Sequence, residues 1–302
     1  MESSSIDLDK YLTFLELDEF KVNHPEPSLD TLSKVVEKHA TKIHYQNAAL
    51  QLKYISGEPI VKEDLLISTI QNKLIDKREG GMCYDINLLM EAALVALGFN
   101  VQLVSAYPAQ LIPGEDCRHL ALIIRIGTKY YIVDPGFGIN KLRAPLEFDF
   151  ETTKETTVFG YEKYQVVVEP TCYHVDLITN DKVLKLFYFM REGSSPVFSK
   201  REKIISEYVT FMKNEQQCLV RDWALFMGGA TADGRLGLWY DKREGLGWIL
   251  KQADYLPALE KVYFKDYEEF RETAKKILNV DIPSELQKVS IRPKYKNPSP
   301  KL

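Results

Sequence analysis

The sequence predicts a mixed α/β protein with three successive parts. Apolar residues recur at helical spacing through residues 1–98, which predicts a helical bundle. Residues 99–195 alternate apolar and polar side chains between turn signals, which predicts an antiparallel β-barrel. Residues 196–302 mix helical and strand patterns, and we expect an α/β lid there that ends in a basic, proline-rich tail.

Composition argues against several classes of protein. The chain has 302 residues, 45% of them hydrophobic, which is enough for a sizeable core. A formal charge of −4 argues against a nucleic-acid partner, which would need a dense basic face. No leader-like start is present and no apolar stretch reaches the roughly 18 residues of a membrane span, so we expect a cytoplasmic protein without a membrane partner.

The cysteines indicate neither a disulfide framework nor a zinc module. There are four, and their spacing is irregular. Cys117 and His119 could supply two ligands, but no second close pair completes a tetrahedral set, so no metal site is predicted.

Three helices are expected before the central motif. Residues 7–21 have amphipathic spacing and stop before two prolines. Ser28 is a suitable N-cap for a second helix over residues 29–39, and we expect His39 in its last turn to be a cation without a functional role. A third helix is expected over residues 63–73.

A glycine pair leads into the most informative stretch of the chain. Gly80 and Gly81 precede Cys83, and an almost wholly apolar run over residues 86–97 ends at Gly98. We interpret the run as a buried helix with Cys83 in its first turn, where free N–H groups and the positive helix end favour a thiolate. This placement predicts a nucleophile.

Two polar residues interrupt the apolar helix. Asn87 and Glu91 are four residues apart, so they form one narrow polar line on the face that Cys83 shares. The alternative for Cys83 is a buried structural cysteine beside a packing glycine pair. The motif needs partners elsewhere in the chain to be catalytic.

A predicted hairpin supplies these partners. His119 opens an apolar strand, and Gly127-Thr128 is typical of a two-residue turn. With that turn Ile126 faces Lys129, so His119 and Asp134 point to the same face of the sheet, within reach of each other. A three-residue turn would put them on opposite faces. Together with the cysteine they predict a Cys-His-Asp core of the papain or transglutaminase type.

The rest of the chain is expected to alternate strands and helices. His174 falls within one of the strands, where we expect it to pack or hydrogen-bond. The expected elements are strands at residues 99–107, 157–168, 173–178 and 183–190, a helix at 199–214, strands at 223–227 and 236–240 around a loop at 228–234, and a helix at 266–278.

Four motifs together resemble the arylamine N-acetyltransferase family. They are Gly-Gly-x-Cys-aromatic-acid-x-Asn, His-Leu-x-Leu and Val-Asp-x-Gly-Phe-Gly in that order, and residues 43–47 in the place of the family's Ile-Pro-Phe-Glu-Asn. The resemblance covers residues 43–138 and implies the same three-part fold, with Cys83, His119 and Asp134 as the triad. It also implies acetyl-CoA or another acyl-CoA as co-substrate, no tightly bound cofactor, and an aromatic amine or hydrazine as acceptor.

The resemblance extends to three residues beyond the triad. It implies that Tyr45 and Phe137 line the acceptor pocket and that Gly138 lies near the coenzyme. The alternative is that the two rings belong to the ordinary core and that Gly138 serves a turn.

Several residues depart from the family pattern. Glu79 stands where the family has Arg, and Gln46 stands where it has Glu, so we expect Gln46 to donate a hydrogen bond to Glu79. Glu115 and Asp116 replace small residues that touch the coenzyme, and carboxylates there would repel a pyrophosphate. Residues 221–223 are larger than the family pattern suggests.

These residues predict ping-pong acyl transfer. Cys83 would take the acyl group as a thioester, its backbone N–H would help to hold the oxyanion, and an amine would discharge the thioester with His119 as base. The alternative is a papain- or transglutaminase-like cysteine hydrolase or cross-linking enzyme, which has the same order of residues. A third possibility is a binding protein with a vestigial triad.

Overall fold

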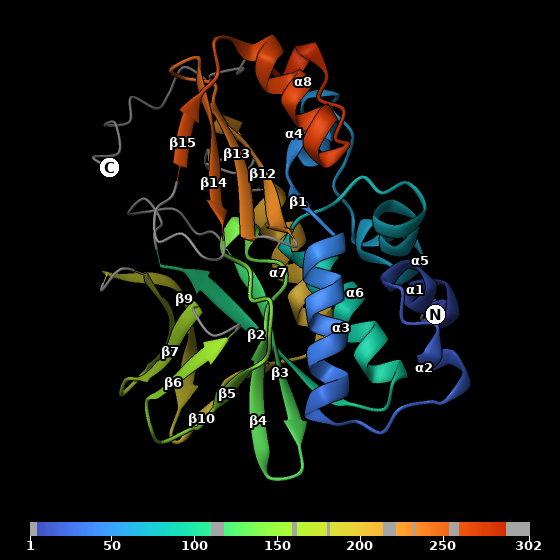
Figure 1. Ribbon diagram of the computed structural model, residues 1–302, viewed down its shortest axis with the longest axis vertical. Coiled ribbons are helices and arrows are strands. Elements are labelled where there is room, and N and C mark those ends of the chain that lie inside the picture. Colours follow the sequence, from blue (N-terminus) through green and yellow to red (C-terminus); the bar gives the residue numbers. More distant parts are fainter. Residues whose placement is uncertain are drawn as a thin grey trace.

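The computed structural model describes residues 5–109, 118–158, 162–179, 182–213, 222–231, 234–253 and 260–287. Figure 1 shows three packed units: a group of helices around α6 (Cys83–Ala96), a β-barrel built on β2 to β9, and a second sheet covered by α8 (Tyr267–Leu278). The predicted mixed α/β class and its three kinds of unit are therefore confirmed.

The first predicted helix is two helices. α1 (Leu8–Leu15) ends at Glu16, which adopts a left-handed φ of 60°, and α2 (Glu19–Val22) begins only after this break. The expectation of one helix over residues 7–21 was wrong because the apolar spacing continues across the break. The second expected helix is α3 (Leu29–Lys42), and Ser28 Oγ accepts the N–H of Thr31 over 3.2 Å as its N-cap.

His39 is neutral and buried, so the expectation of a helix-end cation was wrong. Its Nδ1 lies 2.8 Å from the hydroxyl of Tyr11, inside the bundle. Burial, with a contribution from Lys141, lowers the pKa of His39 from 6.5 to about 3. The residue joins α1 to α3 as a core hydrogen-bonding group.

The chain between α3 and α6 is more broken than expected. The predicted helix at 63–73 is interrupted where Leu66 is extended, with a ψ of 139°. The elements here are β1 (Tyr45–Gln46), α4 (Ala48–Ile55), η1 (Lys62–Leu65), α5 (Ile67–Gln71) and a π-helical turn η2 (Asn72–Asp76). Neither β1 nor α4 was predicted.

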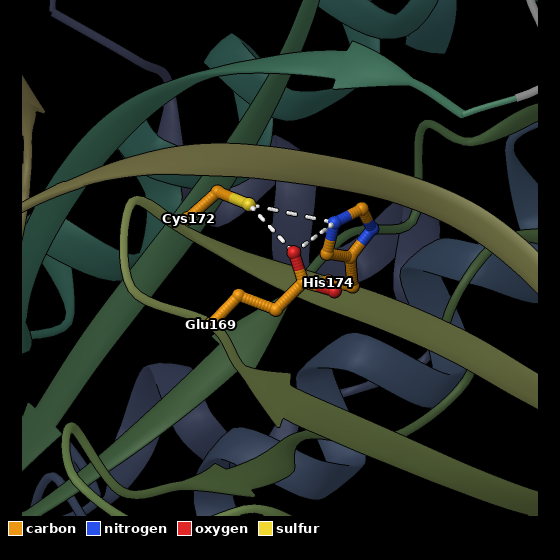
Figure 2. Close-up of side chains that lie close together, drawn as sticks. All are labelled: Glu169, Cys172 and His174. Carbon is orange, nitrogen blue, oxygen red and sulfur yellow. Dashed lines mark hydrogen bonds and ion pairs between the residues drawn. The ribbon is translucent and has the colours of Figure 1, made fainter.

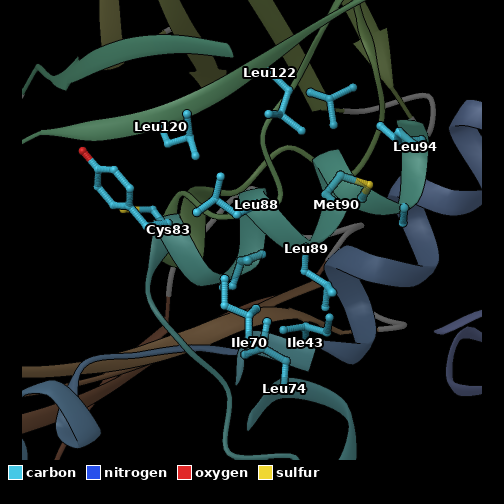
Figure 3. Packing of buried hydrophobic residues seen from close by; sticks show 14 of the residues in the cluster. Ile43, Ile70, Leu74, Cys83, Leu88, Leu89, Met90, Leu94, Leu120 and Leu122 are labelled. Carbon is cyan, nitrogen blue, oxygen red and sulfur yellow. The ribbon is translucent and has the colours of Figure 1, made fainter. Parts of the chain in front are cut away.

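Helix α6 is the centre of the bundle. Figure 3 shows Leu88, Leu89, Met90 and Leu94 of α6 between side chains of the neighbouring helices and Leu120 and Leu122 of β3 (His119–Ile126). Helix α7 (Arg201–Lys213), expected at residues 199–214, packs here as well. Its Tyr208 ring lies 4.7 Å from the ring of Tyr84 on α6. Helix α6, which begins at Cys83, is thus packed against α7 as well as against β3.

The barrel is an antiparallel sheet in the order β5-β4-β3-β2-β9-β8-β7-β6. Its two end strands, β5 and β6, contact each other. Phe148 of β5 lies inside, 4.9 Å from the ring of Tyr173 on β8. Besides β3 the strands are β2 (Asn100–Pro108), β4 (Lys129–Val133), β5 (Leu146–Phe148), β6 (Lys154–Val158), β7 (Glu162–Val168), β8 (Cys172–Thr179) and β9 (Lys182–Glu192), and the short β10 (Ser195–Pro196) and β11 (Phe198–Ser199) pair with β9 and β2.

Two expectations about the barrel were wrong. The single strand expected at 157–168 is replaced by the two strands β6 and β7. Strand β5 was not predicted, because it is only three residues long.

The second sheet has the order β1-β12-β13-β14-β15. The loop expected at 228–234 was wrong at residues 228–231, which belong to β12, and at residue 234, which begins β13. A Cβ on Gly228 would clash with the carbonyl oxygen of Leu236. Asp266 Oδ1 caps α8 by accepting the N–H of Glu269 over 2.9 Å, as the expected helix at 266–278 requires. The other strands are β12 (Ala224–Thr231), β13 (Gly234–Asp241), β14 (Leu246–Ala253) and β15 (Glu260–Tyr263), and η5 (Ser284–Gln287) follows α8.

Elements cross the predicted boundaries at residues 98 and 195. Tyr45 of β1 pairs with Gly228 of β12, and α7 belongs to the bundle core. The exact division into 1–98, 99–195 and 196–302 stays a prediction. Within the described ranges, no helix combines the length and apolar character that crossing a membrane requires.

Some predictions concern residues outside these ranges. They include Glu115, Asp116, Cys117, Arg221 and the basic tail beyond residue 287.

Candidate active site

The glycine pair lets two backbone segments approach closely before α6. Gly80 has a φ of +69°, and a Cβ there would lie 2.6 Å from the carbonyl oxygen of His44. The N–H of Gly81 donates to the same oxygen over 3.1 Å, and Gly81 accepts from the N–H of Gln46 over 2.9 Å. The expected close approach is confirmed, and only glycine fits it.

The side chain of Asp85 caps the start of α6. Its Oδ2 accepts the N–H of Met82 over 2.8 Å and lies 2.8 Å from Nζ of Lys73. Cys83 is the first residue of the helix and is 7% exposed. Its sulfur is therefore held at the positive end of the helix dipole.

The β3–β4 hairpin has the predicted register. Ile126 pairs with Lys129, and Leu122 pairs with Val133. His119 and Asp134 consequently lie on one face of the sheet, with Nε2 of the ring 2.6 Å from Oδ2 of the carboxylate. Both side chains are buried.

The imidazole of His119 contacts both Asp134 and Cys83. Burial by itself lowers the pKa of this ring, but the charges of Asp134 and Cys83, and hydrogen bonds to both, outweigh that effect and raise the pKa to about 10. The three residues that the sequence singled out thus meet at one point. A thiol, an imidazole and a carboxylate in mutual contact can act together in nucleophilic catalysis.

The carboxylate of Asp134 is fixed from its other side. Its Oδ1 accepts a hydrogen bond from Nδ2 of Asn87 over 2.8 Å and another from the N–H of Gly136 over 3.1 Å. Nδ2 of Asn87 also donates to the carbonyl of Leu120. A Cβ on Gly136 would lie 2.8 Å from Nδ2 of Asn87, so the glycine makes this approach possible.

Asn87 was not among the predicted site residues. The available signal was an amide four residues after the cysteine on an otherwise apolar helix. Glu91, the second member of that polar line, has a different partner, since its Oε2 lies 2.9 Å from Nη1 of Arg201.

Two phenylalanines pack on the imidazole. The ring of Phe137 lies edge-on to His119 with 5.0 Å between centroids, and the ring of Phe187 lies 5.4 Å from it. Phe187 comes from β9 and is fully buried. No local pattern predicts this contact, because Phe187 and His119 are far apart along the chain. The predicted role of Phe137 in binding an acceptor stays a prediction.

Tyr45 and Gly138 both lie against Phe226 of β12. The ring of Tyr45 is 5.3 Å from that of Phe226. Gly138 has a φ of +55°, and a Cβ there would lie 2.7 Å from Cε1 of the same ring. Tyr45 is 6% exposed, as the core alternative for this residue requires. Their roles toward acceptor and coenzyme stay predictions.

The expected hydrogen bond between Gln46 and Glu79 does not form. Oε1 of Gln46 accepts the N–H of Ala49 over 3.1 Å, and Oε1 of Glu79 lies 3.8 Å from Nζ of Lys77. Among the described residues no hydrogen bond joins Gln46 to Glu79.

A buried ion network supports the segment that follows Asp134. The guanidinium of Arg235 donates to both carboxylate oxygens of Glu162, over 2.8 and 2.9 Å. It also donates to the backbone carbonyls of Ile139 and Lys141 over 2.7 and 2.8 Å. Arg235 therefore ties β13 and β7 to the chain just beyond the triad carboxylate.

Comparison with known proteins gives a consistent result. A family model described as N-acetyltransferase matches residues 28–286. The arylamine N-acetyltransferase of Mycolicibacterium smegmatis is 30% identical over 158 residues, which are 50% of this chain and 54% of that enzyme. The chain thus spans about half the length of this relative. A chicken (Gallus gallus) arylamine N-acetyltransferase, a pineal gland isozyme, is 22% identical over 91% of this chain and 96% of its own length.

A solved structure has the same fold. The arylamine N-acetyltransferase of Mycobacterium marinum in complex with CoA superimposes with a TM-score of 0.70 and 22% identity, over 91% of this chain and 93% of that one. The predicted arrangement of helices, nearly closed barrel and further sheet is confirmed by this match.

Proposed function

Because the chain belongs to the arylamine N-acetyltransferase family, we propose that it transfers an acetyl or related acyl group from an acyl-CoA to the nitrogen of an arylamine or hydrazine. The observation that carries the proposal is the contact of His119 with both Asp134 and Cys83. The acyl group would pass through a thioester on Cys83 in a ping-pong reaction. A cytoplasmic location stays a prediction.

In the first half-reaction the sulfur of Cys83 attacks the carbonyl carbon of the acyl-CoA thioester. The tetrahedral oxyanion forms next to the start of α6, where the backbone N–H of Cys83 can stabilise it. The carbon–sulfur bond to CoA then breaks, the imidazolium of His119 gives its proton to the departing thiolate, and free CoA leaves. The acyl group remains on Cys83.

In the second half-reaction the amine attacks the thioester on Cys83. The now neutral His119 takes a proton from the amine nitrogen, and the bond between the acyl carbon and Cys83 breaks. The amide leaves, and the thiolate–imidazolium pair is restored. Asp134 stays ionised throughout and holds the ring in orientation.

Three further residues have proposed roles in binding. Phe137, beside His119, would stack against the aromatic ring of the acceptor. Tyr45 would contribute the opposite wall of the acceptor pocket. Gly138 would lie near the coenzyme, where its missing side chain lets the backbone pack against Phe226.

Initial rates of acyl transfer to an aromatic amine test the proposal. Cys83→Ala is expected to abolish transfer, whereas Val95→Ala, at the exposed far end of the same helix, should leave it unchanged. Initial rates at several fixed concentrations of amine should give the parallel double-reciprocal lines of a ping-pong reaction. Full transfer by Cys83→Ala would reject the proposal, and CoA-independent hydrolysis of a peptide or glutamine amide would favour a hydrolase.

A further inference from the structure

Three potential metal ligands converge where β7 turns into β8. Figure 2 shows Glu169, Cys172 and His174 with their polar atoms directed at one another. Sγ of Cys172 lies 3.4 Å from Nε2 of His174 and 3.6 Å from Oε2 of Glu169, and the two latter atoms are 3.4 Å apart. Nothing in the proposed reaction uses these side chains.

The spacing of the three atoms is that of a tetrahedral zinc site. With bonds of about 2.3 Å from zinc to sulfur and about 2.0 Å to nitrogen or oxygen, ligand atoms are about 3.5 Å apart when one is sulfur and about 3.3 Å apart otherwise. The three observed distances, 3.4, 3.6 and 3.4 Å, each lie within about 0.1 Å of these values. The three ligand atoms are therefore already spaced as a tetrahedral zinc ion requires.

The arrangement differs from a second catalytic triad. In a thiol–imidazole–carboxylate relay the sulfur and the carboxylate occupy opposite nitrogens of the ring. Here both face Nε2 of His174, while Nδ1 is buried and has no hydrogen-bond partner among the described residues. Convergence on one nitrogen suits ligands around a common ion.

The turn that carries the ligands is already fixed. The N–H of Glu169 donates to the carbonyl of Cys172 over 2.9 Å, and Nη1 of Arg191 donates to the carbonyl of Glu169 over 3.2 Å. Cys172 and His174 are two residues apart on β8, so their side chains project from the same face of the strand. The backbone of this turn should therefore lose little conformational entropy when a metal ion binds.

The cluster lies on the other side of the sheet from the triad. The ring of His174 contacts that of Tyr188, with 5.4 Å between centroids, whereas the neighbouring Phe187 contacts His119. Adjacent residues of a strand face opposite sides, so the two sites share β9 without sharing a ligand.

We propose that Glu169, Cys172 and His174 bind one zinc ion, with water as the fourth ligand. The thiol of Cys172 donates to Glu169 in the metal-free protein, and it gives its proton to solvent when the sulfur binds the ion. The thiolate and the carboxylate together neutralise the divalent charge. Glu169 is 41% exposed, which leaves the fourth ligand position open to water.

The site differs from a typical structural zinc site in one respect. Zinc-binding imidazoles usually donate their second N–H to a protein group, and loss of that partner lowers affinity by about 10- to 100-fold. Because Nδ1 of His174 has no such partner within the described part of the chain, we expect a lower affinity than in zinc sites that have one. Bound zinc should cross-link the end of β7 to β8.

Metal content of the full chain tests this inference independently of the proposed function. Protein stripped with a chelator, incubated with zinc sulfate and passed through a desalting column should retain one zinc per chain. Cys172→Ser and His174→Gln should each lose it, Glu169→Gln should weaken it, and Cys83→Ser should retain it. Cobalt should give a thiolate charge-transfer band in the wild type that Cys172→Ser removes.

Three outcomes would overturn the inference. They are no zinc retained by the wild type, zinc retained by both Cys172→Ser and His174→Gln, and loss of zinc in Cys83→Ser. Thermal unfolding of the metal-free variants, compared with the metal-free wild type, separates lost ligands from a lost fold. The zinc content and the cobalt spectrum do not depend on acyl transfer, so a failure of the proposed function would leave both unchanged.

Discussion

The side-chain amide of Asn87 donates to the carboxylate of Asp134 over 2.8 Å and so joins the nucleophile helix directly to the segment that orients His119. One amide thereby links the helix that begins at Cys83 to Asp134, the hydrogen-bond partner of His119. Its nitrogen also holds the carbonyl of Leu120, the residue that follows His119. Asn87 acts as a positioning residue for the site.

Replacing Asn87 tests this link. Within the described part of the chain, Asn87→Ala leaves Oδ1 of Asp134 with the N–H of Gly136 as its hydrogen-bond donor, and loss of a buried hydrogen bond to a charged group costs about 1.5–3 kcal/mol. We expect that loss in the free energy of unfolding and a fall in kcat of more than about tenfold. Denaturant unfolding and steady-state kinetics measure both. Glu91→Gln on the same helix is the control, and equal losses of kcat in the two variants would contradict the role.

The charge on His119 should make stability depend on pH. The folded pKa is raised from 6.5 to about 10 through Asp134 and Cys83, so the protonated ring contributes stability that is fully present below pH 6.5 and is lost as the pH rises through about 10. Asp134→Asn removes most of this contribution and should lower kcat by roughly 10³- to 10⁴-fold. The difference in unfolding free energy between wild type and Asp134→Asn should shrink between pH 6.5 and 10. A difference that stays constant would contradict the assigned charge.

Gly138 and Gly193 form a matched pair for the contact with Phe226. Both have a positive φ, +55° and +60°, but a Cβ on Gly138 would lie 2.7 Å from Phe226 whereas a Cβ on Gly193 meets nothing within 4 Å. Alanine at Gly193 should cost about 1 kcal/mol of backbone strain. Alanine at Gly138 should cost that plus about 1–3 kcal/mol for overpacking, and should also reduce acyl transfer. Thermal unfolding of both variants measures the two losses of stability. Equal losses would show that the contact of residue 138 with Phe226 is unimportant.

Breaking the buried Arg235–Glu162 ion pair should lower the free energy of unfolding far more than breaking a surface ion pair. Arg235→Met leaves the carboxylate of Glu162 buried with Arg143 as its remaining cation, and breaking a buried pair on one side costs about 3–5 kcal/mol. Lys275→Met breaks the exposed pair with Asp281 and should cost at most about 1 kcal/mol. Urea unfolding measures both. Comparable losses would mean that solvent reaches the Arg235 network.

Local patterns predicted the core of the site. The glycine pair placed Cys83 at a helix start. The two-residue turn placed His119 and Asp134 on the same face of the sheet. Both arguments use neighbours in sequence and the fixed periods of helix and strand. The same reasoning predicted α3 and the β3–β4 register, because a cap and turn residues mark their ends, and amphipathic spacing predicted α8.

Contacts distant in sequence were not predictable in this way. Phe187 reaches His119 from β9, and Arg235 reaches the backbone beyond Asp134 from β13, and only the tertiary fold brings them there. The place of Asn87 on its helix was a usable signal, but its contact with Asp134 was not. The break at Glu16 was missed because a left-handed residue leaves the apolar spacing intact. The cluster at Cys172 was missed because its carboxylate ligand comes from the preceding turn, although a cysteine and a histidine two apart on a strand were a usable signal.

Intact-mass spectrometry without any acceptor amine tests the central claim most directly. After incubation with acetyl-CoA and rapid quenching in acid, the chain should gain one acetyl group, and peptide mapping should place it on Cys83 and not on Cys172. Released CoA should match the acylated protein in amount. An unmodified chain, or an acetyl group carried by any residue other than Cys83, would contradict the account.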